Sequence, residues 1–193
     1  MTLLFVQKPF TLISCVLAAL CVTACASPNA RIYTLIARDG SPSKGHPVLL
    51  VIEAVDVAKY LNRPELIRRT NDVQLATLDF DRWAEPVGGM IQRVLVEDLR
   101  QRLPKGSLVN TSQTEMGNEA TTLQIVVNRL DVDADGTVML NAIWQLRYTN
   151  GRANKAGQTN IHVRPINNST SAQIEAMNVA VARLAEDILS GLS

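Results

Sequence analysis

The residues that could support acid–base or metal chemistry are few and lie far apart in the sequence. His46 stands beside Pro47 in a stretch rich in Gly, Ser and Pro, and His162 follows Ile161 in an alternating segment. Neither histidine has a second histidine or a carboxylate at the spacing that a metal or catalytic site uses. The sequence therefore predicts no catalytic or metal site at either position.

Three aspartates, Asp131, Asp133 and Asp135, alternate toward Gly136 and raise the question of a calcium loop. An EF-hand loop ends in a glutamate that binds the ion with both oxygens, and this stretch lacks one. An Asp-Ala-Asp-Gly run between two apolar segments is typical of a β-hairpin turn. The prediction is a turn, and calcium is the alternative.

Motifs for nucleotide binding and for acyl transfer are missing from the sequence. It contains no phosphate-binding loop, dinucleotide fingerprint or nucleophile elbow. Gly88 and Gly89 are adjacent inside a helical pattern, where each costs about 1 kcal/mol relative to alanine. We attribute this pair to close packing against a sheet or a neighbouring subunit. We expect neither enzymatic activity nor a dissociable cofactor.

Cys25 carries the clearest chemical signal in the chain. The residues Val22-Thr23-Ala24-Cys25 end an apolar run that begins near Phe10, and Lys8 precedes that run. This order is typical of a secretory signal peptide, and the run is shorter than the ~20 residues of a membrane span. Small residues before a cysteine resemble the lipobox of bacterial lipoproteins, whose cysteine receives a diacylglyceryl group and an N-acyl chain. We predict that Cys25 is lipidated and is the first residue of the mature protein.

Two alternatives to this lipobox stay open. Leu12-Ile13-Ser14-Cys15 also resembles one, although few apolar residues precede it, and an uncleaved anchor helix would make the cysteines incidental. Ala26 follows Cys25, and the lack of an aspartate there favours sorting to the outer membrane in the lipoproteins that the chain resembles. Because Cys15 and Cys21 leave with the signal peptide, we expect no disulfide and no thiolate metal site in the mature chain.

The chain is thus divided into a signal peptide over residues 1–24, a lipidated tether over 25–30 and a single domain over 31–193. Of 193 residues, 169 remain after cleavage, which suffices for a hydrophobic core. Removal of Lys8 leaves 18 basic and 18 acidic residues, and a neutral domain is a poor nucleic-acid binder. The tether reaches at most ~20 Å, so the domain stays close to its membrane.

Apolar periodicity predicts two amphipathic helices. The first spans 87–103 and follows the partly acidic stretch 79–86, which we expect to lead into it. The second begins at Thr170, where Thr170 and Gln173 fit a capping box. We expect a polar loop before Gly117.

The other regular segments are predicted to be strands. A nearly continuous apolar run over 48–57 indicates a buried strand. Segments 66–70 and 73–78 pair across one turn, and segments 122–132 and 137–149 pair across another. With about seven strands and two helices, the chain is predicted to be an α+β domain whose antiparallel or mixed sheet carries both helices on one face.

Aromatic and arginine residues gather in two segments that could form a docking surface, since these residue types are favoured interface anchors. The candidates are Tyr60, Arg63, Arg68, Arg69, Arg82 and Trp83. In the alternative interpretation, Trp83 packs on the following helix, and the arginines are solvated or paired with nearby carboxylates at Glu65, Asp79 and Asp81.

The same segments resemble a known family. Tyr60-Leu61-Asn62-Arg63-Pro64, Ile67-Arg68-Arg69 and Asp81-Arg82-Trp83-Ala84-Glu85-Pro86 are similar to the pattern of the ABC-type transport auxiliary lipoprotein family, which includes PqiC. Tyr33-Thr34-Leu35 also fits. Lys59 departs from the pattern, because members often have proline there.

The resemblance implies a non-enzymatic outer-membrane lipoprotein on the periplasmic face, without a cofactor beyond the lipid on Cys25. Its partners would be an MCE-domain protein, which conducts phospholipids across the periplasm, and the associated inner-membrane permease. Homo-oligomerisation is expected as well. The alternative is a lipoprotein of the LptE type, which assembles or plugs an outer-membrane protein.

Overall fold

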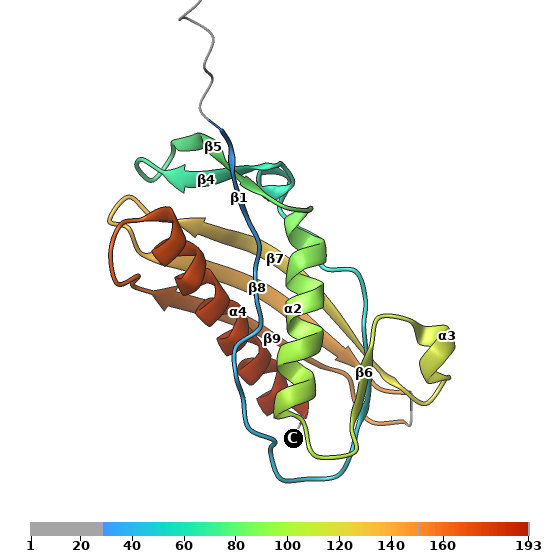
Figure 1. Cartoon of the computed structure of the whole chain (residues 1–193). Coiled ribbons are helices and arrows are strands. Elements are labelled where there is room, and N and C mark those ends of the chain that lie inside the picture. The colour runs from blue at the N-terminus through green and yellow to red at the C-terminus, as the bar shows by residue number, and fades with distance from the viewer. Residues whose placement is uncertain (1–28, 150, 193) are drawn as a thin grey trace, which may run out of the picture.

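A computed structural model describes residues 29–149 and 151–192 of the chain (Figure 1). The predicted signal peptide and Cys25 lie outside these described residues. Among the residues described, none of the helices has the length and apolar composition that a bilayer span requires.

A long hairpin forms the centre of the sheet. It consists of β7 (Thr121–Val132) and β8 (Val138–Arg147), and β9 (Lys155–Val163) pairs with the other edge of β8. Alternate residues of β8 from Val138 to Leu146 are buried, because every second side chain of a strand faces the core. The predicted pairing of segments 122–132 and 137–149 across a turn is confirmed.

The three alternating aspartates lead into the turn of this hairpin. The amide of Asp133 donates to the carbonyl of Thr137 at 2.7 Å, and Gly136 has a φ of +87°. The Asp135 carboxylate accepts the amide proton of Thr137 at 2.9 Å. The turn prediction is confirmed, and no group of three or more metal-ligating side chains occurs within residues 29–149 and 151–192.

The other edge of β7 pairs in succession with three parallel strands. These are β2 (Leu49–Ile52), β3 (Asp56–Val57) and β4 (Glu65–Arg69). The predicted continuous strand over 48–57 is wrong, since it is broken between β2 and β3. The side chain of Gln92 takes part in the break by donating to the carbonyls of Ile52 and Glu53, both at 3.0 Å. The short β6 (Leu108–Asn110) pairs with β2.

A three-stranded extension caps the end of the molecule where the described chain begins (Figure 1). It contains β1 (Arg31–Tyr33), β5 (Leu75–Trp83) and β4, in the order β1-β5-β4. The predicted hairpin of β4 and β5 is confirmed. The stretch 79–86 leads into α2 as expected, but its first part up to Trp83 belongs to β5, which pairs with both β1 and β4.

Two long helices, α2 (Val87–Arg102) and α4 (Thr170–Leu192), cover one face of the nine-stranded sheet, as Figure 1 shows. The α+β class with a mixed sheet is confirmed, although the sheet has more strands than the predicted seven. Short helical turns occur at α3 (Gln113–Met116) and at the 3₁₀ helix η2 (Lys59–Leu61). The loop expected before Gly117 therefore contains a helical turn.

The capping prediction for α4 is displaced by one residue. The hydroxyl of Ser169, not that of Thr170, accepts the amide proton of Ala172 at 3.2 Å, as an N-cap side chain does. The hydroxyl of Thr170 instead donates to Asp81 at 3.4 Å, and the side-chain oxygen of Gln173 accepts a hydrogen bond from Arg68. Thr170 and Gln173 therefore tie the start of α4 to the β4–β5 hairpin.

Candidate docking site

Two sequence segments that are about twenty residues apart meet around one pocket of about 310 Å³. Its lining comes from residues 62–64, which follow η2, and from residues 83–86, which connect β5 to α2. The lining residues are Asn62, Arg63, Pro64, Trp83, Ala84, Glu85 and Pro86.

Backbone hydrogen bonds hold these segments together. The amide of Trp83 donates to the carbonyl of Pro64 at 2.7 Å, and the amide of Ala84 donates to the carbonyl of Tyr33 at 2.8 Å. Pro64 and Pro86 each have a fixed φ, which makes the backbone rigid at these positions. Neither has an amide proton, so neither leaves an unpaired hydrogen-bond donor at the pocket. The pocket is thus held in place by hydrogen bonds within this chain.

The side chains of the pocket combine an apolar lining with charged groups. Trp83 is half-buried and packs against the core, and the two proline rings add apolar surface beside it. Arg63 pairs with Glu65 at 3.4 Å, and Glu85 pairs with Arg93 of α2 at 3.0 Å. Such a site suits an apolar side chain flanked by polar backbone, which is the chemistry of peptide recognition.

Tyr60 and Arg69 belong to a different environment, the buried carboxylate of Asp131. The Tyr60 hydroxyl donates to Asp131 at 2.8 Å, Arg69 approaches it at 3.4 Å, and Arg129 donates to it at 2.8 Å. Burial and the hydrogen bond to Asp131 raise the pKa of Tyr60 above its ordinary range. These groups join η2, β4 and β7, so their role here is structural.

Arg68 is also directed inward, because its guanidinium donates to Gln173 of α4 at 2.9 Å. Arg82 is exposed at the end of β5. The six predicted docking residues therefore separate into two groups. Arg63 and Trp83 line the pocket, and Arg82 is exposed next to Trp83 on β5. Tyr60, Arg68 and Arg69 instead hold elements of the fold together. Docking itself stays a prediction.

The two histidines lie apart from the pocket and from each other. His46 is exposed in the loop before β2, and His162 is exposed on β9. The sequence did not indicate that Asp131 binds Tyr60, Arg69 and Arg129, beyond its being a charged residue next to apolar ones. It also did not indicate Asn62 and Ala84 as pocket residues, since neither has a residue type that indicates function.

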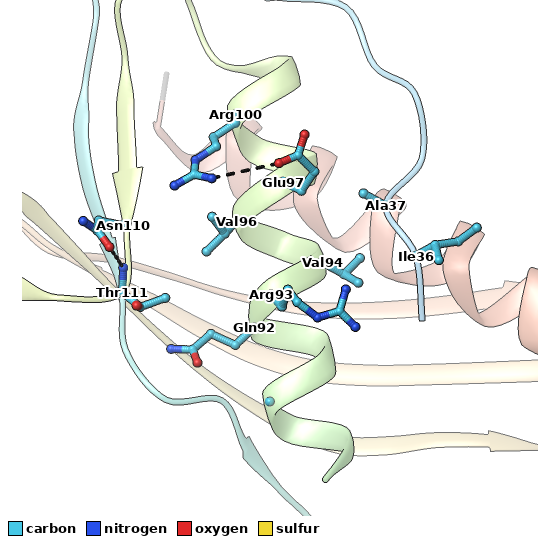
Figure 2. Close-up of a pocket in the computed structure, with 11 residues that line it drawn as sticks. Ile36, Ala37, Gln92, Arg93, Val94, Val96, Glu97, Arg100, Asn110 and Thr111 are labelled. Atoms are coloured by element: carbon cyan, nitrogen blue, oxygen red, sulfur yellow. Dashed lines mark hydrogen bonds and ion pairs between the residues drawn. The ribbon is translucent and has the colours of Figure 1, made fainter. Parts of the chain in front are cut away.

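A larger hollow of about 480 Å³ lies along the exposed side of α2 (Figure 2). Ile36 and Ala37 border it on one side, and Asn110 and Thr111 border it on the other. Two of its charged side chains already have partners. Arg93 binds Glu85 at 3.0 Å, and Arg100 donates to the carbonyl of Val109 at 2.9 Å. The hollow therefore offers a ligand fewer free groups than its size implies.

Comparisons with known proteins identify the chain's relatives. The model of the family described as ABC-type transport auxiliary lipoprotein component matches residues 33–189. A crystal structure of an uncharacterized protein has a TM-score of 0.75 at 22% identity, covering 86% of this chain and all of its own. The protein XCC0632 from Xanthomonas campestris, of the family DUF330, has a TM-score of 0.67 at 17% identity, covering 82% of this chain and 92% of its own.

A more distant structure is a PelC variant dodecamer from Paraburkholderia phytofirmans, with a TM-score of 0.40 at 10% identity, covering 75% of this chain and 94% of its own. This similarity is too low to support an argument about assembly. No curated protein sequence matches the chain. The family match covers all of the described helices and strands except the first residues of β1 and the last turn of α4, and the chain belongs to the ABC-type transport auxiliary lipoprotein family.

Proposed function

We propose that this protein is the outer-membrane auxiliary component of an MCE-type phospholipid transport system, held to the membrane by lipid on Cys25. It acts by binding, on the periplasmic face, and it docks the end of the conduit that spans the periplasm. It also self-associates, as a conduit end with several subunits would require. Membership of an auxiliary transport family supports a role in binding over a role in catalysis.

The convergence of two family-like segments on one pocket is the observation that carries this proposal. Residues 62–64 and 83–86 belong to the segments that resemble the family, and they line the same 310 Å³ pocket. Core packing alone does not require an open pocket lined by a tryptophan and two prolines. A binding role explains why these residue types lie together at the surface.

The position of the pocket supports docking close to the membrane. Trp83 pairs with Tyr33 in the register of β1 and β5, and β1 begins six residues after Cys25. Those six residues span at most ~20 Å. A domain of this size has a radius of gyration of about 15 Å, so it cannot cross the periplasm by itself, and a partner must reach it.

A pull-down from cells that express the tagged, acylated full chain tests the proposal. Wild-type protein should recover an MCE-domain protein. Arg63→Glu, which reverses a charge at the pocket, and Ala84→Arg, which fills it, should each lose most of that recovery without a change in melting temperature. Lys105→Glu is the matched charge reversal, since Lys105 is an exposed residue in the turn after α2.

Two results would contradict the proposal. Equal recovery from wild type and both pocket variants would mean that the conduit docks elsewhere. Recovery of a β-barrel protein without an MCE protein would favour the LptE-type role. Trp83→Ala is informative only beside the other variants, because a lower melting temperature with normal recovery would mean that Trp83 serves packing alone.

A further inference from the structure

Exposed apolar side chains are concentrated at the end of the molecule where the described chain begins. Within residues 29–149 and 151–192, nine large apolar residues are exposed, and four of them lie in the β1-β5-β4 extension or in its hairpin turn. These four are Ile32, Val73, Leu75 and Phe80. A fifth, Ile166, precedes α4, whose first residue contacts Asp81 of β5.

Two of these side chains share the outer face of the extension with an arginine. Ile32 is opposite Arg82 in the parallel register of β1 and β5, and Phe80 is two residues from Arg82 on the same strand. Because side chains alternate along a strand, all three point to one face. Ile32 is 61% exposed and Phe80 is 47% exposed, whereas Asp81, which points to the opposite face, is buried.

The turn between β4 and β5 holds a further apolar residue away from the protein. Val73 is 93% exposed, and the side chain of Asn71 accepts hydrogen bonds from the amides of Val73 and Gln74 at 3.0 and 2.9 Å. The turn is therefore ordered by its own hydrogen bonds while its apolar tip contacts no core. Transfer of the Val73 side chain from water into another apolar phase would therefore be favourable.

Chain length indicates which phase that is. The described chain begins at Asn29, four residues after Cys25. Four residues span at most ~14 Å, so a bilayer that holds lipid on Cys25 is kept within reach of this end of the domain. Aliphatic and aromatic side chains beside an arginine also match a membrane interface, where acyl chains meet phosphate groups.

We propose that Ile32, Val73, Phe80 and Arg82, here called the anchor-end surface, insert into the interfacial layer of the bilayer that carries the lipid anchor. The apolar side chains enter the boundary of the acyl chains, and the Arg82 guanidinium binds lipid phosphate. This contact fixes the orientation of the domain and keeps the pocket at Trp83 beside the membrane. The inference depends on the anchor at Cys25 within the proposed function, and it does not depend on the MCE partner.

Depth-dependent quenching in proteoliposomes tests the anchor-end surface. No cysteine follows Cys25 in the sequence, so an introduced cysteine is the one free thiol of the acylated protein. Val73→Cys and Phe80→Cys would each carry an environment-sensitive fluorophore, in vesicles of phosphatidylethanolamine and phosphatidylglycerol. Leu108→Cys is the matched control, because Leu108 is also an exposed apolar residue but lies on β6, away from the extension.

Fluorophores at positions 73 and 80 should show blue-shifted emission, and spin-labelled lipid should quench most of their fluorescence. The fluorescence of the label at position 108 should be unaffected. Labels at 73 and 80 that are as unquenched as the one at 108 would overturn the proposal. Acylated protein that fails to float with the vesicles would overturn it together with the anchor. A pull-down that recovers no MCE protein, with quenching intact, would contradict only the docking role.

Discussion

At the scale of single residues, the buried carboxylate of Asp131 explains why two of the six predicted docking residues, Tyr60 and Arg69, are structural. Asp131 is fully buried in β7, and its oxygens receive hydrogen bonds from Tyr60 and Arg129 and an ion pair from Arg69. A charge of this kind is tolerated only where partners satisfy it. Tyr60 and Arg69 therefore serve the fold first.

Replacement of Asp131 by alanine should destabilise the protein by about 3 kcal/mol, because two partly buried arginines would lose their carboxylate. Tyr60→Phe removes one hydrogen bond and should cost about 1 kcal/mol. Urea unfolding followed by circular dichroism measures both. Asp79→Ala is the control, since Asp79 is exposed and bonds with the nearby hydroxyl of Thr77. An Asp131→Ala midpoint equal to that of the control would contradict the structural role of this cluster.

A second carboxylate, that of Asp81, makes the attachment of β1 sensitive to acid. Arg31 forms a two-bond pair with Asp81 at 2.6 and 2.8 Å. Burial raises the pKa of Asp81, but hydrogen bonds from Arg31, Tyr33 and Thr170 outweigh it and hold the pKa below the ordinary value of 3.8. Because the folded-state pKa is lowered, the stability that Asp81 contributes is complete above pH 3.8 and is lost as the pH falls through the lowered value.

Asp81→Asn should therefore unfold more easily than wild type at neutral pH, by about 1 kcal/mol, since one partner of the pair is exposed. The difference should shrink as the pH falls below 3.8, where wild type also loses the charge. Thermal melts at a series of pH values check this. A difference that is constant across the series would mean that packing, and not ionisation, is responsible.

At the scale of elements, the glycine pair at the start of α2 shows how closely the helix approaches the strands. A Cβ at Gly88 would lie 2.6 Å from the carbonyl oxygen of Val55, in the break between β2 and β3. A Cβ at Gly89 would contact nothing within 4 Å. The prediction of close packing is thus confirmed for Gly88, whereas Gly89 faces open space.

The two glycines make a matched pair of substitutions. Gly88→Ala should destabilise the protein by about 2 kcal/mol, because backbone must move to admit the methyl group. Gly89→Ala should stabilise it by about 1 kcal/mol through helix propensity. Urea midpoints of the two variants test this. A stabilising Gly88→Ala would contradict the close approach, and a destabilising Gly89→Ala in an oligomer would indicate that a neighbouring subunit contacts this position.

At the scale of the whole molecule, the β1-β5-β4 extension connects the N-terminal end of the described chain to the rest of the domain. It joins the first described strand to β7 through β4 and to α4 through Thr170 and Gln173. The pocket and the anchor-end surface both lie on this extension or at its edge, so the proposed membrane attachment and the proposed binding share one end of the molecule.

Cys25→Ala should leave the protein without lipid and move it from the membrane fraction to the soluble periplasmic fraction. The physical reason is that the proposed lipid on Cys25 would be the attachment to the bilayer, through burial of its acyl chains. Fractionation with immunoblotting measures the shift. Normal membrane recovery of the variant would contradict the assignment of Cys25 and would favour the uncleaved anchor helix.

Self-association is the remaining prediction at this scale. The acylated protein in detergent micelles should have a molar mass of several subunits, measured by light scattering with the detergent contribution subtracted. A single-subunit mass over the concentrations present in the envelope would contradict the proposed role as an oligomeric conduit end.

The amino-acid sequence was sufficient to predict the α+β class, the central hairpin, the two amphipathic helices and the family. Local pattern specifies these features, because periodicity and turn residues act over a few positions. The family-like segments likewise marked residues 60–64 and 81–86 through their residue types and order alone.

Which of those residues are available to a partner depends on the tertiary fold. Tyr60 and Arg69 are drawn to Asp131, which is more than sixty residues away in the sequence, and Arg68 is drawn to Gln173. Partners this distant carry no sequence signal. The end of β5 was likewise fixed by pairing with β1. Buried charges require a partner, and the tertiary fold decides where that partner lies. Of the six predicted docking residues, Arg63, Arg82 and Trp83 are therefore the ones that stay available to a binding partner.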